Sequence, residues 1–559
     1  MALVTASDAP KKEKYTVGLS GSIEEKLSAL DVIGQLGGGG ALEMDYLDEV
    51  LPLLEDPSLE VRCATVMAIG DIGEFASAEI DKILAILEDP SFDMKRAALF
   101  AIGCMGSSIS EIAAPEVVAF LQDDDVDLRV AALGALGGLK AWGYQDEVRI
   151  CMQEGDAAVV VAALNVVTKW GEDGQQLAPD VAGCITHPNR AVRAAAATAI
   201  TACGCAGERQ AEKVAVALLD EDNTVREATV KFFEAAGTAA KKAAPVVAEG
   251  LGNKDGRLLA ASVMALGYMK AGKYAKQVSG FLSSGYDGDA SLGLSLAGVE
   301  AKLPTALRRP ACAAALALGM MGKEAHSYAG EIAKCLGEDT PAEATACFVK
   351  ALGLMGTGAK EHETMLREMA EESSPPIREA VCFALGEIGK LTDDAMTAST
   401  LAGRLRDSHP LVRKAAVIGL SKMEAEGPPF AEEIVKLFGD KVDAVQIAAV
   451  KAMLSLGVTG QLYATHVARK MLDGFVPVRA AAAEVLGDLE ERGAAFADEL
   501  VALLGDPEGP VREAALNSLA KMGDEARPFL KEITAACSDP LESVRAAADL
   551  CATALSATE

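Results

Sequence analysis

Apolar residues recur along most of this chain at helical spacing, in a pattern that repeats. The clearest copy runs from Leu54 to Gly73, where Val66, Ile69 and Ile72 fall on one side of a helix. An Asp-Pro dipeptide precedes this stripe. Asp-Pro is typical of a turn, because proline disfavours helical geometry in the residue before it. The pattern therefore predicts two helices joined by a short acidic turn, which we name helix A and helix B.

The same unit returns along almost the whole chain. We number each copy by the residue that takes the place of Arg62 in helix B, and we name this place the ladder position. The ladder positions are Lys26, Arg62, Lys95, Arg129, Val160, Arg193, Arg226, Leu259, Ala311, Thr345, Arg378, Arg413, Gln446, Arg479, Arg512 and Arg545. Most of them are 33 or 34 residues apart, which is typical of repeat proteins. The sequence predicts an all-α, right-handed α-solenoid of about sixteen two-helix repeats of about 33 residues.

Small residues follow the ladder position at fixed distances. Glycine eight residues later, as at Gly70, is expected to let two backbones approach closely. Alanine two residues later, as at Ala64, is expected where neighbouring helices touch most closely. Glycine eleven residues later is expected to end helix B, because glycine adopts the left-handed conformation of a helix C-cap at little cost. Gly73, Gly106, Gly171, Gly204, Gly237, Gly356, Gly457 and Gly523 occupy that place.

These motifs together resemble HEAT repeats. The resemblance is greatest to the short-period variety named after the phycobilin lyases, whose hallmark is Asp-Pro, then Val-Arg, then Ala-x-x-Ala-Leu-Gly. It covers nearly everything after about residue 23 and implies a helical solenoid. The resemblance does not specify a function, because function depends on sites grafted onto a fold.

An acidic residue lies six residues before most of the basic ladder positions. In HEAT families such residues form a ladder of charge pairs between successive repeats, so the resemblance implies a structural role for them. The ladder residues are Asp56, Arg62, Asp89, Lys95, Asp123, Arg129, Asp220, Arg226, Asp407, Arg413, Asp506, Arg512, Asp539 and Arg545. The base is missing at Leu259, Ala311 and Thr345, in the centre of the chain.

The centre also holds the one large irregularity. The step from Leu259 to Ala311 is 52 residues, about 19 more than one period. The extra residues fall in the turn between helices A and B, at about residues 283–304. Long loops in compact repeats are usually functional or disordered, and both interpretations stay open. We expect residues 1–22 to form a flexible tail and residues 23–559 to form a single solenoid with this insertion.

Helix B of a solenoid exposes one side along the concave face. In this chain the residues one, five and nine places after the ladder position vary, which indicates contact with solvent or a ligand. The N-terminal repeats place Met67, Arg96, Phe100 and Cys104 there, and the C-terminal third places charged residues there. In the centre these places are apolar. They predict a partner-binding surface made by Met264, Tyr268, Leu316, Met320, Leu354 and Phe383, although some of these side chains could instead belong to the core between helices.

Composition excludes several classes of partner. The chain has 82 acidic and 52 basic residues, a net charge of −30, whereas nucleic acids and anionic membranes attract basic surfaces. No apolar run approaches the roughly 18 residues that a membrane-spanning helix needs, and no secretory signal is visible. The 12 cysteines show no Cys-x-x-Cys spacing. We expect reduced, buried thiols and a cytoplasmic protein.

No motif for catalysis, a cofactor or a metal is visible. The five histidines lie in different repeats, and no Gly-Lys pair is followed by Ser or Thr. We therefore predict a non-catalytic protein-interaction scaffold or adaptor, monomeric within a larger complex, without a cofactor. One version resembles the scaffold subunit of a heterotrimeric protein phosphatase. The alternatives are a transport receptor or chaperone-like binder of basic cargo, suggested by charge, and a bilin-lyase-like enzyme, suggested by the repeat variety.

Overall fold

The computed structural model describes residues 18–36, 44–283, 309–337, 340–539 and 541–556. Over these ranges the chain forms α-helices and 3-10 helices, with no β-strand. Its contacts divide it into two units: residues 1–207, 507–509 and 538–545 form the first, and residues 208–506, 510–537 and 546–559 form the second. Most of the expected tail at 1–22 and of the expected insertion at 283–304 lies outside the described residues. Each unit is an α-solenoid, and a single solenoid over residues 23–559 stays a prediction.

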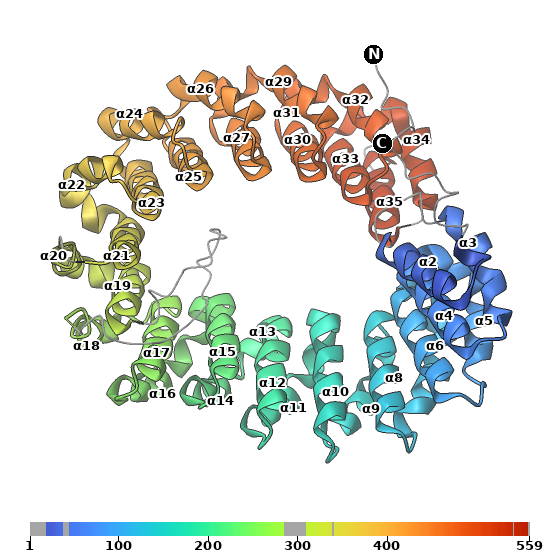
Figure 1. The fold of residues 1–559 in the computed structure, drawn as a ribbon. Coiled ribbons are helices and arrows are strands. Elements are labelled where there is room, and N and C mark those ends of the chain that lie inside the picture. The colour runs from blue at the N-terminus through green and yellow to red at the C-terminus, as the bar shows by residue number, and fades with distance from the viewer. Residues whose placement is uncertain (1–17, 37–43, 284–308, 338–339, 540, 557–559) are drawn as a thin grey trace. The chain divides into compact units, whose positions relative to one another are not determined.

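Helix B is the longer helix of each repeat, and Figure 1 shows these helices side by side in chain order within each unit. Every ladder position lies in the first turn of one of them. The B helices are α2 (Ile23–Leu36), α4 (Leu59–Ile72), α6 (Phe92–Cys104), α8 (Val126–Gly138), α10 (Ala157–Trp170), α12 (Arg190–Ala202), α15 (Asn223–Ala236), α17 (Gly256–Tyr268), α19 (Pro310–Met321), α21 (Ala342–Met355), α23 (Pro375–Thr392), α25 (Pro410–Ser421), α27 (Asp443–Ser455), α30 (Val476–Asp488), α33 (Gly509–Met522) and α35 (Glu542–Ser556).

Helix A is shorter and often starts with a 3-10 segment, as at Gly73–Glu79 and Gly356–His362. The α-helical parts on this side of the repeats are α3 (Met44–Val50), α5 (Ile80–Ile86), α7 (Ser110–Val118), α9 (Gln145–Met152), α11 (Ala178–Gly183), α13 (Gly204–Glu208), α14 (Ala211–Val214), α16 (Ala244–Glu249), α18 (Ala275–Ser279), α20 (Ala329–Lys334), α22 (Glu363–Glu368), α24 (Ala395–Arg404), α26 (Ala431–Lys436), α28 (Gly457–Gln461), α29 (Ala464–Arg469), α31 (Glu490–Ala494), α32 (Ala497–Ala502) and α34 (Leu530–Ala535).

The turn between helices A and B is closed by its own polar side chains. The carboxylate of Asp123 accepts the backbone N–H of Asp125 at 2.9 Å. Asp125 in turn caps α8 by accepting the N–H of Leu128 at 3.1 Å. An N-terminal cap satisfies a backbone donor that has no partner inside the helix. The acidic turn therefore fixes where helix B begins.

Of the eight expected C-cap glycines, Gly73, Gly171, Gly237 and Gly356 are confirmed as C-caps, whereas Gly106, Gly204 and Gly457 follow the C-cap by one residue. All eight have a positive φ, from 49° at Gly237 to 81° at Gly106. Lys140 and Lys270 stand eleven residues after their ladder positions, with φ of 49° and 48°. The repeat therefore imposes left-handed geometry at this place even where the residue has a side chain.

Successive B helices approach most closely through small residues. A Cβ atom on Gly70 would lie 2.7 Å from the Cα of Ala101 on the next B helix, and one on Gly353 would lie 2.6 Å from the Cα of Ala384. Close approach at the glycine eight residues after the ladder position is thus confirmed. Ala64 is half-buried, whereas its counterparts Ala97 and Ala481 are 4% and 3% exposed, so a closest contact at this alanine stays a prediction.

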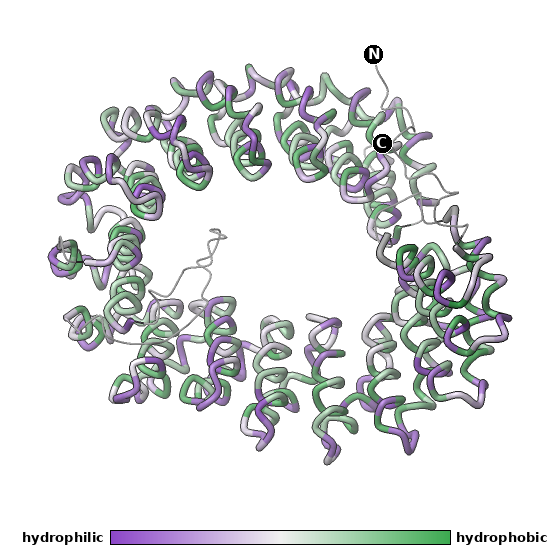
Figure 2. Tube along the Cα trace, viewed as in Figure 1, coloured by the Kyte–Doolittle hydropathy of each residue, from purple (hydrophilic) through white to green (hydrophobic). Residues whose placement is uncertain are grey.

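The side chains on the apolar stripe form the core. Val66, Ile69 and Ile72 are at most 2% exposed, as their spacing predicts. Figure 2 shows hydrophobic and hydrophilic positions alternating along the helices, as expected where each helix buries one side against its neighbours.

The base at a ladder position bridges two repeats. Nη1 of Arg413 donates to the backbone carbonyl of Asp407, in its own turn, at 2.8 Å. Nε and Nη2 of Arg413 donate to the carboxylate of Asp440, in the next repeat, at 2.7 and 2.8 Å. Arg378 does the same with the carbonyl of Glu372 at 2.9 Å and with the Asp407 carboxylate at 2.7 and 2.8 Å. Within one repeat, the arginine therefore contacts the backbone carbonyl of the acidic residue. The charge pair itself joins this arginine to the acidic residue of the next repeat.

The remaining ladder residues follow parts of this scheme. Pairs with the acid of the next repeat join Lys26 to Asp56 at 2.7 Å, Arg129 to Glu154 at 3.4 Å and Arg479 to Asp506 at 2.9 Å. Carbonyls six residues earlier accept from Arg62, Arg129, Arg226, Arg512 and Arg545 at 2.7–2.9 Å. The carboxylates of Asp89, Asp220 and Asp539 accept the N–H two residues later at 2.7–3.0 Å. Nζ of Lys95 lies 5.7 Å from the ring centroid of Phe120.

At some repeats that lack a basic ladder residue, another side chain makes the contacts of the missing base. Gln446 donates to the carbonyl of Asp440 at 2.7 Å, like the arginines that it replaces. Lys470 forms an ion pair with Asp473 and donates to the carbonyl of Phe438 at 2.8 Å. Lys350, five residues after Thr345, pairs with Glu379 of the next repeat at 3.0 Å. The link between repeats is thus kept by different residues.

The close contacts predict opposite effects for two glycines of the first unit. Gly70→Ala should destabilise α4 and α6 by about 1–3 kcal/mol, because the new methyl group overlaps the backbone at Ala101. Gly134→Ala should be neutral or stabilise α8 by about 0.5–1 kcal/mol, because a Cβ there meets nothing within 4 Å. Hydrogen exchange of the helix amides measures both. Equal losses of protection would contradict this packing.

The ladder predicts a local effect of removing one base. Arg413→Ala should destabilise α25 and α27 by about 1–3 kcal/mol, because it leaves the largely buried carboxylate of Asp440 without its partner. Lys436→Ala is the control, since its pair with Glu432 is exposed. Hydrogen exchange should rise near α25 and α27 and stay unchanged in α15. Equal exchange in both helices would disprove a nearest-neighbour ladder.

The same pairs predict a dependence on pH. Burial raises the pKa of Asp440, but hydrogen bonds from Arg413 and from the N–H of Val442 outweigh it, and the net pKa lies below its ordinary value. The pKa of Asp407 is lowered in the same way by Arg378 and His409. Their stabilisation should be complete above the ordinary pKa of about 4 and lost as the pH falls through the lower folded values. Asp440→Asn should reduce this loss around α27, and an unchanged pH profile would contradict the assignment.

Candidate protein-interaction surface

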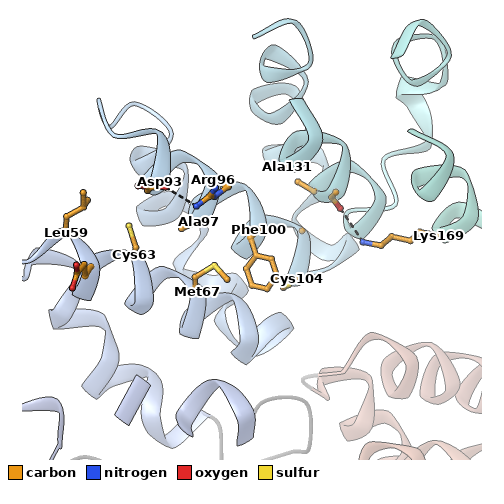
Figure 3. A pocket seen from close by; sticks show the side chains of 14 residues that line it. Leu59, Cys63, Met67, Asp93, Arg96, Ala97, Phe100, Cys104, Ala131 and Lys169 are labelled. Atoms are coloured by element: carbon orange, nitrogen blue, oxygen red, sulfur yellow. Dashed lines mark hydrogen bonds and ion pairs between the residues drawn. The ribbon is translucent and has the colours of Figure 1, made fainter. Parts of the chain in front are cut away.

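A groove lies on the exposed side of the B helices in the first unit. It has a volume of about 620 Å³, within the range of small-molecule and peptide sites. Helices α4, α6, α8 and α10 line it with Leu59, Glu60, Cys63, Met67, Asp93, Arg96, Ala97, Phe100, Gly103, Cys104, Ala131, Gly134, Ala135 and Lys169. We name it the α4–α10 groove, and Figure 3 shows it from close by.

The floor of the α4–α10 groove is apolar and exposed. Leu59, Met67 and Phe100 are 39%, 39% and 38% exposed. The sequence placed Met67, Arg96, Phe100 and Cys104 on the concave side, and the structure brings all four to this groove. Cys63 stands one place after its ladder position, as the rule for the concave side predicts. Leu59 was missed, although it lies one turn before Cys63 on α4.

The basic groups at the rim already have partners. Arg96 forms an ion pair with Asp93 at 2.9 Å, and Nζ of Lys169 lies 3.5 Å from the carbonyl of Gly134 (Figure 3). Glu60 adds a negative charge at the same rim. The cations of the groove are thus engaged by neighbouring oxygen atoms.

The two thiols in the groove are held in the neutral form. Sγ of Cys63 donates to Sδ of Met94 at 3.4 Å. Burial, and secondarily the charge of Asp93, raises the pKa of Cys63, whereas burial and the charge of Asp71 raise the pKa of Cys104. A thiol is nucleophilic only as the thiolate. The groove therefore offers apolar contact rather than a nucleophile.

An acidic pair lies beside the groove. Asp71 follows Met67 by one turn on α4, and its side chain rests on α2, since a Cβ on Gly34 would lie 2.6 Å from Oδ2 of Asp71. Burial and the nearby charge of Asp31 raise the pKa of Asp71. Both carboxylates are exposed. Asp71 therefore lies one turn beyond the part of α4 that lines the groove.

The six central residues predicted to bind a partner fall into two groups. Met264, Tyr268 and Leu316 are buried, with 1%, 9% and 0% of their surface exposed. Burial raises the pKa of Tyr268 most strongly, followed by its contact with Glu234. These three side chains are not exposed as predicted, because each is buried in the core. Met320, Leu354 and Phe383 are half-buried, and a role for them in binding stays a prediction.

The charged side of the C-terminal B helices is largely neutralised by its own residues. Lys451 pairs with Glu484 at 3.0 Å and Lys521 with Asp488 at 2.7 Å. Lys422 pairs with Glu387 and lies over the ring of Phe383, 5.6 Å from its centroid. Each pair joins two successive repeats. These charges link helices to one another, unlike the apolar floor of the α4–α10 groove.

Comparison with known families identifies the repeats. A family model described as HEAT repeats matches residues 329–421, 364–454 and 466–551, and a model described as HEAT repeat matches residues 47–76. This chain is a HEAT-repeat protein. The phycobilin-lyase variety of the repeat stays a prediction.

The HEAT-repeat protein is also similar to solved structures. Yeast importin-beta (Kap95p) matches with 13% identity and a TM-score of 0.57, over 97% of this chain and 84% of that one. The chain in the Kap95:Nup1 complex matches with 13% identity and a TM-score of 0.56 over the same shares. Importin beta in an ammonium sulfate condition matches with 12% identity and a TM-score of 0.53, over 98% and 84%. These likenesses concern the fold. A search among curated proteins finds no match.

The described residues show neither a metal-binding cluster nor a single helix able to cross a membrane. No group of three or more His, Cys, Asp or Glu side chains able to bind a metal ion occurs in residues 18–36, 44–283, 309–337, 340–539 and 541–556. Within the same ranges no single helix is long and apolar enough to cross a membrane. The helix pair Phe92–Cys104 and Ser107–Gln122 together has the length and apolar composition of a membrane span, but its two parts are bent by 108°. The HEAT repeats thus offer an apolar groove as their best-defined site.

Proposed function

We propose that this HEAT-repeat protein is a non-catalytic binder of other proteins and that the α4–α10 groove receives a segment of its partner. The observation that carries the proposal is the exposed apolar floor formed by Leu59, Met67 and Phe100. Exposed apolar surface that is concave and rimmed by polar groups marks interaction sites. The floor also lies on the side of helix B that solenoids use for binding.

A receptor for basic cargo is the version with the most support. The chain carries a net charge of −30, which attracts cationic partners and speeds their association. One of the similar solved structures is a complex with a protein partner, the Kap95:Nup1 complex. A scaffold that holds the subunits of a phosphatase would use the same groove, and partner identification separates the two. All cysteines among the described residues are free, which supports a cytoplasmic, reducing environment.

Co-purification tests the groove. The intact chain and the double variant Met67→Ala, Phe100→Ala would be used to capture partners from the source cells. The variant should lose the main partner by about tenfold or more, because aromatic and Met anchors dominate such interfaces. Circular dichroism should stay close to that of the parent, since both side chains lie at the groove surface, 39% and 38% exposed.

A control removes two exposed apolar side chains elsewhere in the unit. Ile112 on α7 and Ile150 on α9 are each 57% exposed and lie outside the groove. The double variant Ile112→Ala, Ile150→Ala should keep the partner. Retention by the groove variant, or equal loss by both variants, would refute the groove as the binding site. In that case Met320, Leu354 and Phe383 become the next residues to change.

A further inference from the structure

We infer that the partner segment seated in the α4–α10 groove is a short helix with an apolar seam, a Lys or Arg side chain at the Glu60 end and an Asp or Glu side chain at the Lys169 end. This inference rests on the proposed function and adds the chemistry of the occupant. It follows from the two charges that line the ends of the groove and from the helices that form its floor.

The two ends of the groove carry opposite charges. Glu60 follows Leu59 in the first turn of α4, whereas Lys169 stands in the last turn of α10. Both charged residues line the groove, and both are exposed. Figure 3 shows Leu59 and Lys169 at opposite ends of the row of labelled side chains, with Met67 between them. A segment that crosses the floor therefore meets a carboxylate at one end and an ammonium group at the other.

Neither of these two charges is neutralised by an ion pair within the part of the chain that the structure describes. Nζ of Lys169 approaches the carbonyl of Gly134 at 3.5 Å, which is a neutral oxygen beyond the usual hydrogen-bond range. The other two charges of the rim, Asp93 and Arg96, are paired with one another at 2.9 Å. A partner therefore gains an ion pair at each end when it places a base beside Glu60 and an acid beside Lys169.

The floor favours a partner whose backbone is satisfied internally. Met67, Phe100 and Gly134 lie within α4, α6 and α8, where backbone N–H and C=O groups bond to one another along the helix. An extended segment would lay its own backbone groups on apolar side chains without a strand edge to pair with. A helix pairs those groups itself and presents apolar side chains every three or four residues.

The size of the groove sets the length of the occupant. Packed helices stand about 8–10 Å apart, so the two steps from α4 to α8 cover about 16–20 Å. Nζ of Lys169 reaches back to Gly134 on α8, so both charges lie within that span. At about 1.5 Å per residue it corresponds to a helix of about 11–13 residues. A Cβ on Gly134 would meet nothing within 4 Å, which leaves room beside Phe100 for a large apolar side chain of the partner.

Three synthetic 16-residue helical peptides with the same leucine seam test the inference. The mixed peptide carries two Lys at one end and two Glu at the other, the Lys peptide carries Lys at both ends, and the Glu peptide carries Glu at both ends. Fluorescence anisotropy at 150 mM salt measures their affinity for the full chain. The mixed peptide should bind at least threefold more tightly than the Glu peptide, whose acids meet Glu60. Equal affinities, or no binding by any peptide, would overturn the inference.

Charge reversal at Lys169 separates a contact in the groove from the general field of a chain with a net charge of −30. Lys169→Glu should shift the preference from the mixed peptide towards the Lys peptide by about fivefold, because the acid of the mixed peptide then meets a carboxylate. Lys82→Glu makes the same change of charge on α5, outside the groove, and should shift this preference by less than twofold. Equal shifts would overturn the inference, because only the long-range field would then matter.

The opposite end is tested in the same way. Glu60→Lys should shift the preference from the mixed peptide towards the Glu peptide by about fivefold. The matched control Glu111→Lys changes an exposed residue of α7 outside the groove and should shift it by less than twofold. Circular dichroism of the variants should match that of the parent, since the substituted side chains are exposed. An unchanged preference in the Glu60 variant would contradict a basic end of the occupant.

Capture of the natural partner distinguishes this inference from the proposed function. If capture depends on Met67 and Phe100 but is unchanged by both charge reversals in the groove, the proposed function stands and the charged ends are wrong. If capture does not depend on Met67 and Phe100, the proposed function fails and this inference fails with it. Self-association of the intact chain that the Met67→Ala, Phe100→Ala variant abolishes would place a second copy in the groove and overturn the inference.

Discussion

Contact between successive B helices is the constraint on which this protein depends. No repeat can bury its apolar stripe alone, because a pair of short helices leaves one side of each exposed to water. The stripe is buried only when the next B helix approaches within the distance that Gly70 and Gly353 allow. Where a glycine of one helix meets an alanine of the next, the backbones themselves are in contact. Small residues at this contact therefore set the spacing of the repeats.

The polar ladder complements this contact at the other end of helix B. Arg378, Arg413 and Arg479 each hold their own turn by a carbonyl and the next turn by a carboxylate. One side chain thus joins the local fold of a repeat to the stacking of two repeats. Lys470 and Lys350 show that a cation at another sequence position can make the link in place of the arginine.

The α4–α10 groove is a consequence of the same geometry. The residues that face away from the B-helix contact are free of packing requirements, so they can vary without loss of the solenoid. In the C-terminal repeats they carry charges that pair between repeats, as in Lys451 with Glu484. In the first unit they carry Leu59, Met67 and Phe100, which leave an apolar surface in contact with water. That difference makes the first unit the better candidate for binding.

Local chemistry explains what the sequence by itself determined. Helix starts, C-caps and the buried stripe depend on residues close together in the chain, so the acidic turn, Gly73 and Val66 could be assigned from the sequence alone. The sequence could not decide between Ala64 and Gly70 as the closest helix contact, because contact between two helices depends on their crossing and not on either sequence alone. The exposed residues of the groove could be named in part, as Met67 and Phe100, from their place in the repeat. Only the tertiary structure decided that these two lie on an open floor while Met264 and Leu316 are core. Equivalent positions in a repeat have the same local geometry, but their exposure depends on what packs against them, and that is set by residues far away in the chain.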